Sequence, residues 1–189
     1  MIQNFFQLQY DFEIEQKRNL DGLINIPIVA LTVLGGAMST LLVRFDYMSS
    51  MVMSVLFLIS MVSGSMGVCK AFYFATTSFI GFRYQKLASA PMLIQHYDSL
   101  YDWHLRNGST DAKLRAQEDF DSFLCLRLSE ASEHNGALNI LRGERMHEAT
   151  KSIAFSFAML LLATPFFLVL QIMNSDEPQR IEIVAPIPS

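Results

Sequence analysis

Few side chains in this sequence have the type and spacing that chemistry needs. Glu144 and His147 form one Glu-x-x-His pair, the spacing by which helix bundles hold a di-iron centre. Such a centre needs a second pair and further carboxylates on facing helices, and residues 130–133 (EASE) lack the histidine. We therefore expect no metal site from this pair.

A second polar group lies within nine residues but divides between two helix faces. His96 and His104 share one face, whereas Asp98 and Asp102 share another. A joint metal site is therefore awkward. The sequence also has no Gly-x-Ser-x-Gly element, phosphate-binding loop or Cys/His nucleophile pair. We expect a protein that is not an enzyme and that needs no cofactor.

The elements that carry these residues are dominated by three apolar stretches, at about 23–43, 51–70 and 152–173. Each has about the 20 residues that a helix needs to cross a bilayer. Apolar residues make up 51% of the chain, and its mean hydropathy is +0.29. Acidic residues precede the first stretch, so we expect no signal peptide and a retained N-terminus. The sequence predicts an all-α protein with three transmembrane helices.

Basic residues predict the orientation. The positive-inside rule places the N-terminus and residues 83–151 in the cytoplasm, and the tail 174–189 in the periplasm, of a bacterial inner membrane. The cations on the predicted inner side are Lys17, Arg18, Arg83, Lys86, Arg142, Arg145 and Lys151; the other side has Arg44 and Arg180. The net charge is −4 and the cations are interspersed with acids, so we expect no direct contact with nucleic acid.

Residues 83–151, between the second and third spans, have the apolar spacing of helices. One is expected over 85–106, followed by a turn at Asn107-Gly108 and a second helix from about Asp111. The two would form a cytoplasmic helical hairpin, with 85–150 available to a cytosolic protein partner. After Asn135-Gly136 the second helix either kinks or continues into the third span. A continuous helix would couple the hairpin to the membrane.

The N-terminal segment, 1–22, has two competing patterns. Residues 8–15 alternate apolar and polar side chains as a strand does. However, residues 13–18 are good helix formers, and Glu13 and Lys17 make a favourable pair. We expect a helix along the membrane interface, with aromatic residues facing lipid.

Small and hydroxyl side chains gather inside two spans. Ser60 and Gly64 have the small-xxx-small spacing that lets helices approach closely. Two explanations remain open: packing within one chain, or a seam between subunits or along a pore. The seam candidates are Ser60, Ser63, Gly64, Ser65, Gly67, Gly35 and Gly36.

Lys70 also has two explanations. It either lies at the inner boundary, with its amine reaching the headgroups, or is an intramembrane charge and a functional candidate. We expect Lys70 and Arg83 at the inner mouth of any pore.

Short segments recur in a characteristic pattern throughout the chain: residues 10–21 (YDFEIEQKRNLD), 26–27 (IP), 34–36 (LGG), 81–84 (GFRY), 90–91 (AP), 120–124 (FDSFL) and 165–167 (PFF), with Tyr97, Tyr101 and Asn135. These segments resemble an uncharacterised family of small bacterial proteins with three predicted spans. Proteins of this size are similar to membrane effectors of anti-phage defence systems, so the resemblance implies an inner-membrane effector. The chain departs from effectors gated by nucleotide second messengers, because it has no recognisable nucleotide-binding domain and its soluble part lies between spans. A protein trigger is therefore favoured.

We therefore expect an oligomer that permeabilises or depolarises the membrane when a cytosolic partner triggers it, in the manner of an ion channel. The alternative is a membrane anchor, scaffold or sensor subunit that recruits a cytosolic complex. A third reading, an enzyme acting on lipid or metal, would require Glu144 or His147.

Overall fold

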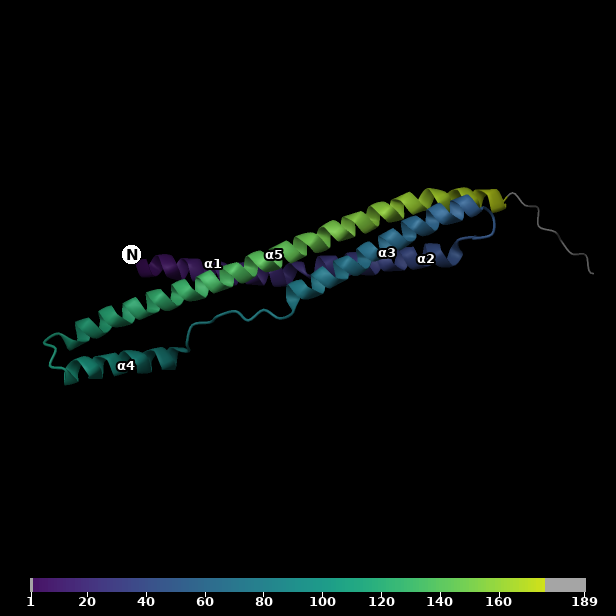
Figure 1. Ribbon diagram of the computed structural model, residues 1–189. Helices are drawn as coiled ribbons and strands as arrows, with labels where there is room; N and C mark the ends of the chain where they lie inside the picture. Colours follow the sequence, from purple (N-terminus) through teal and green to yellow (C-terminus); the bar gives the residue numbers. More distant parts are fainter. Residues whose placement is uncertain (1, 176–189) are drawn as a thin grey trace, which may run out of the picture. The chain divides into compact units, whose positions relative to one another are not determined.

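The computed structural model describes residues 2–175, and these contain five α-helices and no strand (Figure 1). The predicted all-α class is confirmed, and residues 8–15 are helical. The predicted tail lies outside the described residues from position 176 onward. The helices are α1 (Ile2–Leu23), α2 (Asn25–Arg44), α3 (Met51–Phe79), α4 (Ala90–Arg106) and α5 (Ala112–Ser175).

Three helical stretches are long and apolar enough to cross a membrane: Ile2–Arg44, Met51–Phe79 and Ala112–Met173. The first consists of α1 and α2 in succession. Length and composition thus agree with a multi-pass membrane protein. The chain divides into two compact units, described here separately. The first unit contains residues 2–25 and 74–147, and the second contains 26–73 and 148–175.

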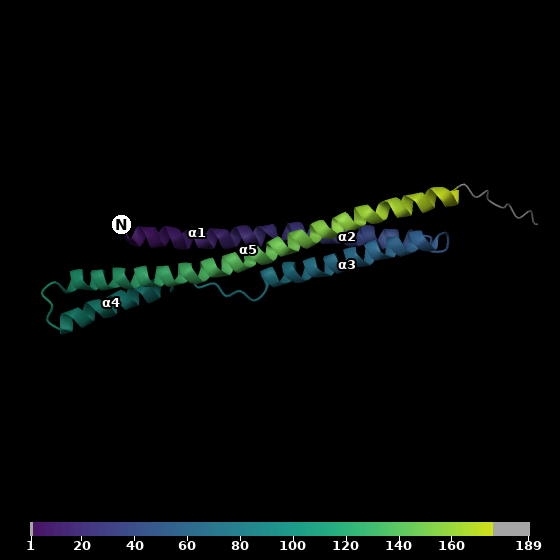
Figure 2. The ribbon, with the colours of Figure 1, turned by 45° about the horizontal axis from the view of Figure 1, so that its top comes forward.

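The second unit packs α2, most of α3 and the last part of α5 around an apolar core. Figure 2 shows α2 and α3 side by side in opposite directions. The rings of Phe45 and Phe57 stack with their centroids 3.8 Å apart. Many outward side chains are also apolar, as a helix in lipid requires. The buried core residues are Met38, Phe45, Phe57, Met61, Ala163 and Leu170.

The first unit contains a helical hairpin of α4 and the start of α5. The ring of His96 lies 4.3 Å from that of Phe123, measured between centroids. At the end of α4, Ser109 N–H donates to His104 O at 3.1 Å and Gly108 N–H donates to Leu105 O at 3.2 Å. Gly108 has φ +70°, so these bonds form a Schellman motif, which ends α4 and turns the chain.

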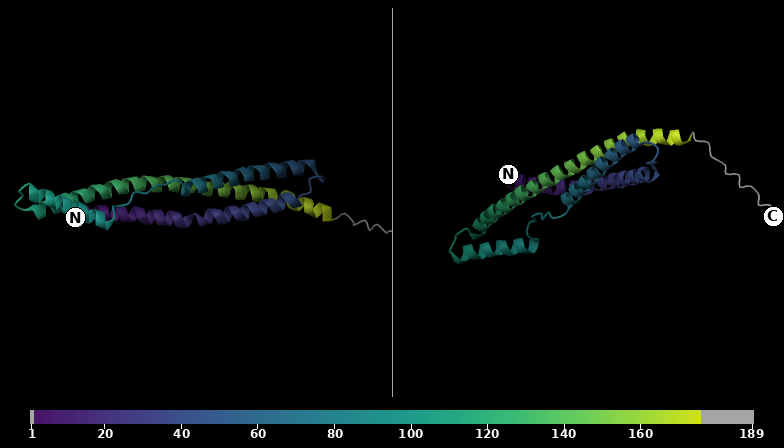
Figure 3. Two further views of the ribbon diagram at one scale, coloured as in Figure 1. Left: turned by 90° about the horizontal axis from the view of Figure 1, so that it is seen from below. Right: turned by 45° about the vertical axis from the view of Figure 1, so that its right-hand side comes forward.

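The connection between α3 and α4 is not helical over residues 80–89, although a helix was expected from position 85. Gly81 has φ +97°, a backbone conformation that glycine adopts readily and other residues rarely do. A residue with positive φ commonly follows the end of a helix, and α3 ends at Phe79. Pro91 occupies the first turn of α4, where a missing N–H costs nothing, so that helix begins at Ala90 rather than at position 85. Figure 3 shows residues 80–89 as a drawn-out trace between the two helices.

The second hairpin helix continues without a break at Asn135-Gly136. The Asn135 side chain bonds to the main chain of Gln85 and so does not compete for the backbone of its own helix. Of the two alternatives for this position, the structure has the continuous helix. Residues 112–175 accordingly form one element, α5.

Candidate functional site

Gly64 and Gly67 lie where α3 meets α5 within the second unit. A methyl group on Gly64 would lie 3.0 Å from Met38 Cε and 3.3 Å from Met159 Cβ. A methyl group on Gly67 would collide with Ser156 Oγ and lie 3.0 Å from Phe155 Cδ1. Both glycines therefore serve close packing within the chain. That they also form a seam between subunits stays a prediction.

Ser156 shows how close this packing is. Its hydroxyl is fully buried and lies 3.0 Å from Gly64 O and 2.9 Å from Ser152 O. A hydroxyl of α5 can reach a carbonyl of α3 because no side chain stands between the two backbones at Gly64 and Gly67.

The other seam candidates have more open surroundings. Gly35 and Gly36 are exposed, and a methyl group on either would have no atom within 4 Å. Ser60 is half-buried and donates to Leu56 O at 3.0 Å. Ser63 and Ser65 are also half-buried.

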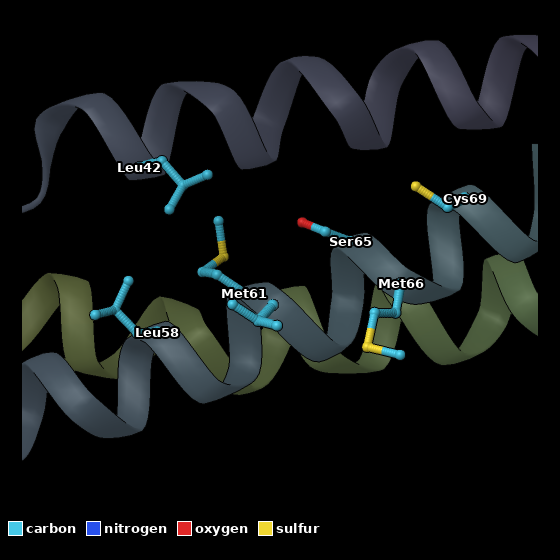
Figure 4. A pocket seen from close by; sticks show the side chains of 7 residues that line it. Leu42, Leu58, Met61, Ser65, Met66 and Cys69 are labelled. Atoms are coloured by element: carbon cyan, nitrogen blue, oxygen red, sulfur yellow. The ribbon is translucent and has the colours of Figure 1, made fainter.

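Ser65 lines a groove of about 400 Å³ between α2 and α3 (Figure 4). Every other side chain along it is apolar or a thiol: Leu42, Leu58, Met61, Val62, Met66 and Cys69. Such a lining suits an acyl chain or another apolar helix rather than a polar ligand.

Lys70 and Arg83 belong to different units. Lys70 is exposed, with its Nζ 3.9 Å from Glu148 Oε2. The Arg83 side chain is exposed, while its main-chain oxygen lies 3.0 Å from His134 Nε2. A common inner mouth formed by these two cations stays a prediction.

A buried polar site lies in the first unit, around Arg142. This side chain is only 3% exposed, and its guanidinium bonds to three different segments. Nε donates to Ser78 O at 2.8 Å, Nη1 to the Tyr84 hydroxyl at 3.0 Å, and Nη2 to Asp21 Oδ1 at 2.7 Å. The rings of Phe82 and Tyr84 lie within cation–π distance, at 5.7 and 5.8 Å. Arg142 thus joins α1, the end of α3 and the α3–α4 connection to α5.

The same face of α5 extends this network through two asparagines. Asn139 accepts a hydrogen bond from the Tyr84 hydroxyl at 2.6 Å and donates to Glu13 Oε2 at 2.8 Å. The Asn135 amide accepts from Gln85 N–H at 2.9 Å and donates to Gln85 O at 3.0 Å. We call this network the polar clasp; its residues are Glu13, Asp21, Tyr84, Gln85, Asn135, Asn139 and Arg142.

The polar clasp changes the titration of its charged pair. Burial alone would raise the pKa of Asp21, but hydrogen bonds from Arg142 and Lys17 outweigh it and hold that pKa below its ordinary value. Burial alone would likewise lower the pKa of Arg142, yet its bonds to Tyr84 and Asp21 raise it. Both groups are therefore charged at neutral pH, which makes this a charge-assisted contact.

No family model, curated protein or solved structure matches this chain. The function must be inferred from the arrangement of its own residues.

The residues first considered for chemistry do not converge. Asp98 and Asp102 are exposed on α4, while His104 is buried with its Nε2 2.8 Å from Asp119 Oδ2. Within residues 2–175, no group of three or more His, Cys, Asp or Glu side chains could hold a metal ion. Glu144 is exposed on α5, as is His147.

Sequence reasoning did not identify the polar clasp. Asn135, Asn139 and Arg142 recur at intervals of four and three, which places all three on one face of α5. This spacing was the one sequence signal for a shared site. It did not distinguish such a site from an ordinary solvated face, because polar residues along one side of a helix normally face solvent. Asn135, Asn139 and Arg142 are instead buried, with 0%, 8% and 2% of each residue's surface exposed. Asp21 and Tyr84, which complete the site, are far away in sequence.

Proposed function

We propose that this chain is an oligomeric membrane effector that permeabilises or depolarises the bacterial inner membrane when a cytosolic partner acts on its first unit. Anti-phage defence is the setting that the family resemblance implies. The observation that supports the proposal is the continuity of α5. One helix carries Arg142 in the polar clasp and, further along, Ser152 and Ser156, which contact Gly67.

The resting state in this proposal is held by the polar clasp. Charge-assisted hydrogen bonds such as that between Arg142 and Asp21 are worth about 1.5–3 kcal/mol each. A partner that breaks several of them at once frees α5 from α1 and from the α3–α4 connection. Since α5 is continuous, its displacement shifts Ser156 against Gly64 and Gly67 in the spans. Tightly packed contacts of this kind change between discrete arrangements rather than gradually.

The proposed contact between subunits uses Gly35 and Gly36. Both are exposed, and small residues let two membrane helices approach closely. Lys70 and Arg83 would then lie at the inner mouth, where cations favour the passage of anions.

Membrane potential is the property to measure, with a voltage-sensitive dye in cells that produce the protein with the products of its neighbouring genes. The wild type should depolarise the cells when triggered. Gly67→Leu should abolish this response because the side chain meets Ser156 and Phe155. Gly22→Leu is the matched control, since a Cβ there has no atom within 4 Å.

A membrane anchor or scaffold gives a different result. It predicts a steady potential in every condition and a partner that still co-purifies with Gly67→Leu. An enzyme predicts that Glu144→Gln or His147→Ala abolishes the response while the oligomer remains intact. Either result, obtained with the protein confirmed in the membrane, would overturn the proposal.

A further inference from the structure

The extended segment between α3 and α4 is bonded to α5 along one edge. Arg83 O lies 3.0 Å from His134 Nε2, and both main-chain groups of Gln85 pair with the Asn135 amide. In an extended strand, main-chain groups of residues two apart point to the same side. The bonds at Arg83 and Gln85 therefore all belong to a single edge of the backbone.

The intervening residues have unpaired main-chain groups. The main-chain N–H and C=O groups of Tyr84 and Lys86 have no hydrogen-bond partner within the part of the chain that the structure describes. No proline occurs between Gly81 and Ser89, so every residue there has a donor. Main-chain groups need a partner, and an unpaired strand edge is a template for another chain.

A pocket of about 440 Å³ adjoins this segment. Leu87 of the segment, Leu93 of α4 and Phe123 of α5 give it an apolar wall. Lys86, Arg127 and Glu130 give it charge, and Arg127 bonds to Glu130 at 2.9 Å. The pocket thus has room for an apolar side chain against this wall, with the positive charge of Lys86 among its lining residues.

We propose that residues 84–88 bind an extended peptide segment of a partner protein as an added strand. An apolar side chain of the peptide fills the pocket, and an acidic residue pairs with Lys86. This inference rests on the proposed function, because it gives the cytosolic partner its docking site.

Two features make such an added strand stable enough to bind. A two-stranded pairing alone is marginal in water, so an anchor in the pocket between Leu93 and Phe123 is needed. In addition, the bonds from Asn135 to Gln85 already hold the receiving segment in place. Binding therefore orders only the peptide, which lowers its entropic cost. Strand addition of this kind takes affinity from the main chain and specificity from the pocket.

The probe is a phage-displayed library of random eight-residue peptides, selected on the full-length protein in lipid nanodiscs. Enriched peptides should contain an acidic residue near an apolar one. In fluorescence anisotropy, N-methylation of every second peptide residue should weaken binding by about tenfold or more, since each change removes a main-chain donor. N-methylation of the residues between should have little effect. A pattern without this period of two would overturn the proposal.

Leu93→Glu places a charge in the pocket and should abolish binding. Met92→Glu is the matched control, because Met92 is exposed and does not line the pocket. Thermal unfolding will show whether Leu93→Glu folds. Lys86→Glu is a second test that does not depend on that variant, because Lys86 is exposed. It should weaken the binding of acidic peptides. Equal binding by Lys86→Glu and the wild type would also overturn the proposal, as would a library without enriched peptides. If the protein depolarises cells but binds no peptide in these experiments, the docking site is wrong and the proposed function still stands.

Discussion

Arg142 Nη2 and Asp21 Oδ1 lie 2.7 Å apart, which joins the middle of α5 to the end of α1 through a buried guanidinium. The other nitrogens of Arg142 are bonded to Ser78 O and to the Tyr84 hydroxyl. A substitution at Arg142 therefore removes contacts to three segments simultaneously, whereas a substitution at Asp21 removes the contact to α5 and the bond from Lys17 within α1.

We expect Arg142→Met to be strongly destabilising. It leaves Ser78 O without its donor, and an unsatisfied buried group costs about 1–3 kcal/mol. The Tyr84 hydroxyl loses its bond from Arg142 but keeps its bond to Asn139. The melting temperature of the detergent-solubilised protein should fall by about 2–4 °C per kcal/mol. Arg127→Met is the control, because Arg127 is 57% exposed and surface pairs contribute about 0–1 kcal/mol. Equal melting temperatures for the two variants would contradict a structural role for the polar clasp.

Acid should weaken the contact between Asp21 and Arg142. The pKa of Asp21 is lowered in the folded protein, so the folded state binds fewer protons than the unfolded state around that pKa. The stabilisation is present above the unfolded pKa, about 3.9, and is lost as the pH falls through the lower folded value.

The measurement is the difference in melting temperature between the wild type and Asp21→Asn as a function of pH. This difference should be constant from about pH 7 to pH 5 and should shrink below about pH 4. A difference that already disappears near pH 6 would show that another group controls the contact.

Two glycines of α5 allow a matched test of the contact with α1. Gly143 has no atom within 4 Å of an added methyl group, so Gly143→Ala should stabilise the helix by up to about 1 kcal/mol. A methyl group on Gly136 would lie 3.3 Å from the Glu13 carboxyl group, which also bonds to Asn139. Gly136→Ala should therefore stabilise less than Gly143→Ala or destabilise. Thermal unfolding of both variants checks this, and identical gains would place α1 away from Gly136.

Much of the fold could be predicted from the sequence because its signals are local. Uncharged apolar stretches of about 20 residues indicated the spans, and Asn107-Gly108 indicated the turn of the hairpin. The second span was predicted over about 51–70, whereas α3 continues along the apolar run to Phe79 and ends before Gly81, where the backbone has a positive φ. That conformation depends on where the chain must turn rather than on hydrophobicity.

The polar clasp could not be predicted in the same way, because its partners are far apart in sequence. Asn139 bonds to Glu13 and Arg142 bonds to Asp21 across most of the chain. From the sequence alone, Arg142 can equally be a solvated cation that sets the membrane orientation or a buried partner of another segment. Only the packing of α1 and the α3–α4 connection against α5 distinguishes the two roles.

The contact between Gly67 and Ser156 gives the last prediction. A methyl group on Gly67 would collide with Ser156 Oγ, so Gly67→Ala should destabilise by about 1–3 kcal/mol through overpacking. Gly22→Ala is the control, because a methyl group there meets no atom within 4 Å and Gly22 is not a seam candidate.

Ser156→Ala removes the colliding oxygen and should recover part of the stability lost in Gly67→Ala. Full recovery is not expected, since Phe155 Cδ1 and Ser152 O would still lie 3.0 and 3.3 Å from the new methyl group. The four proteins of this double-mutant cycle are compared by thermal unfolding in the same detergent. If the two substitutions are simply additive, α3 and α5 do not meet at these residues. The coupling of α5 to the spans in the proposed effector would then lose its structural basis.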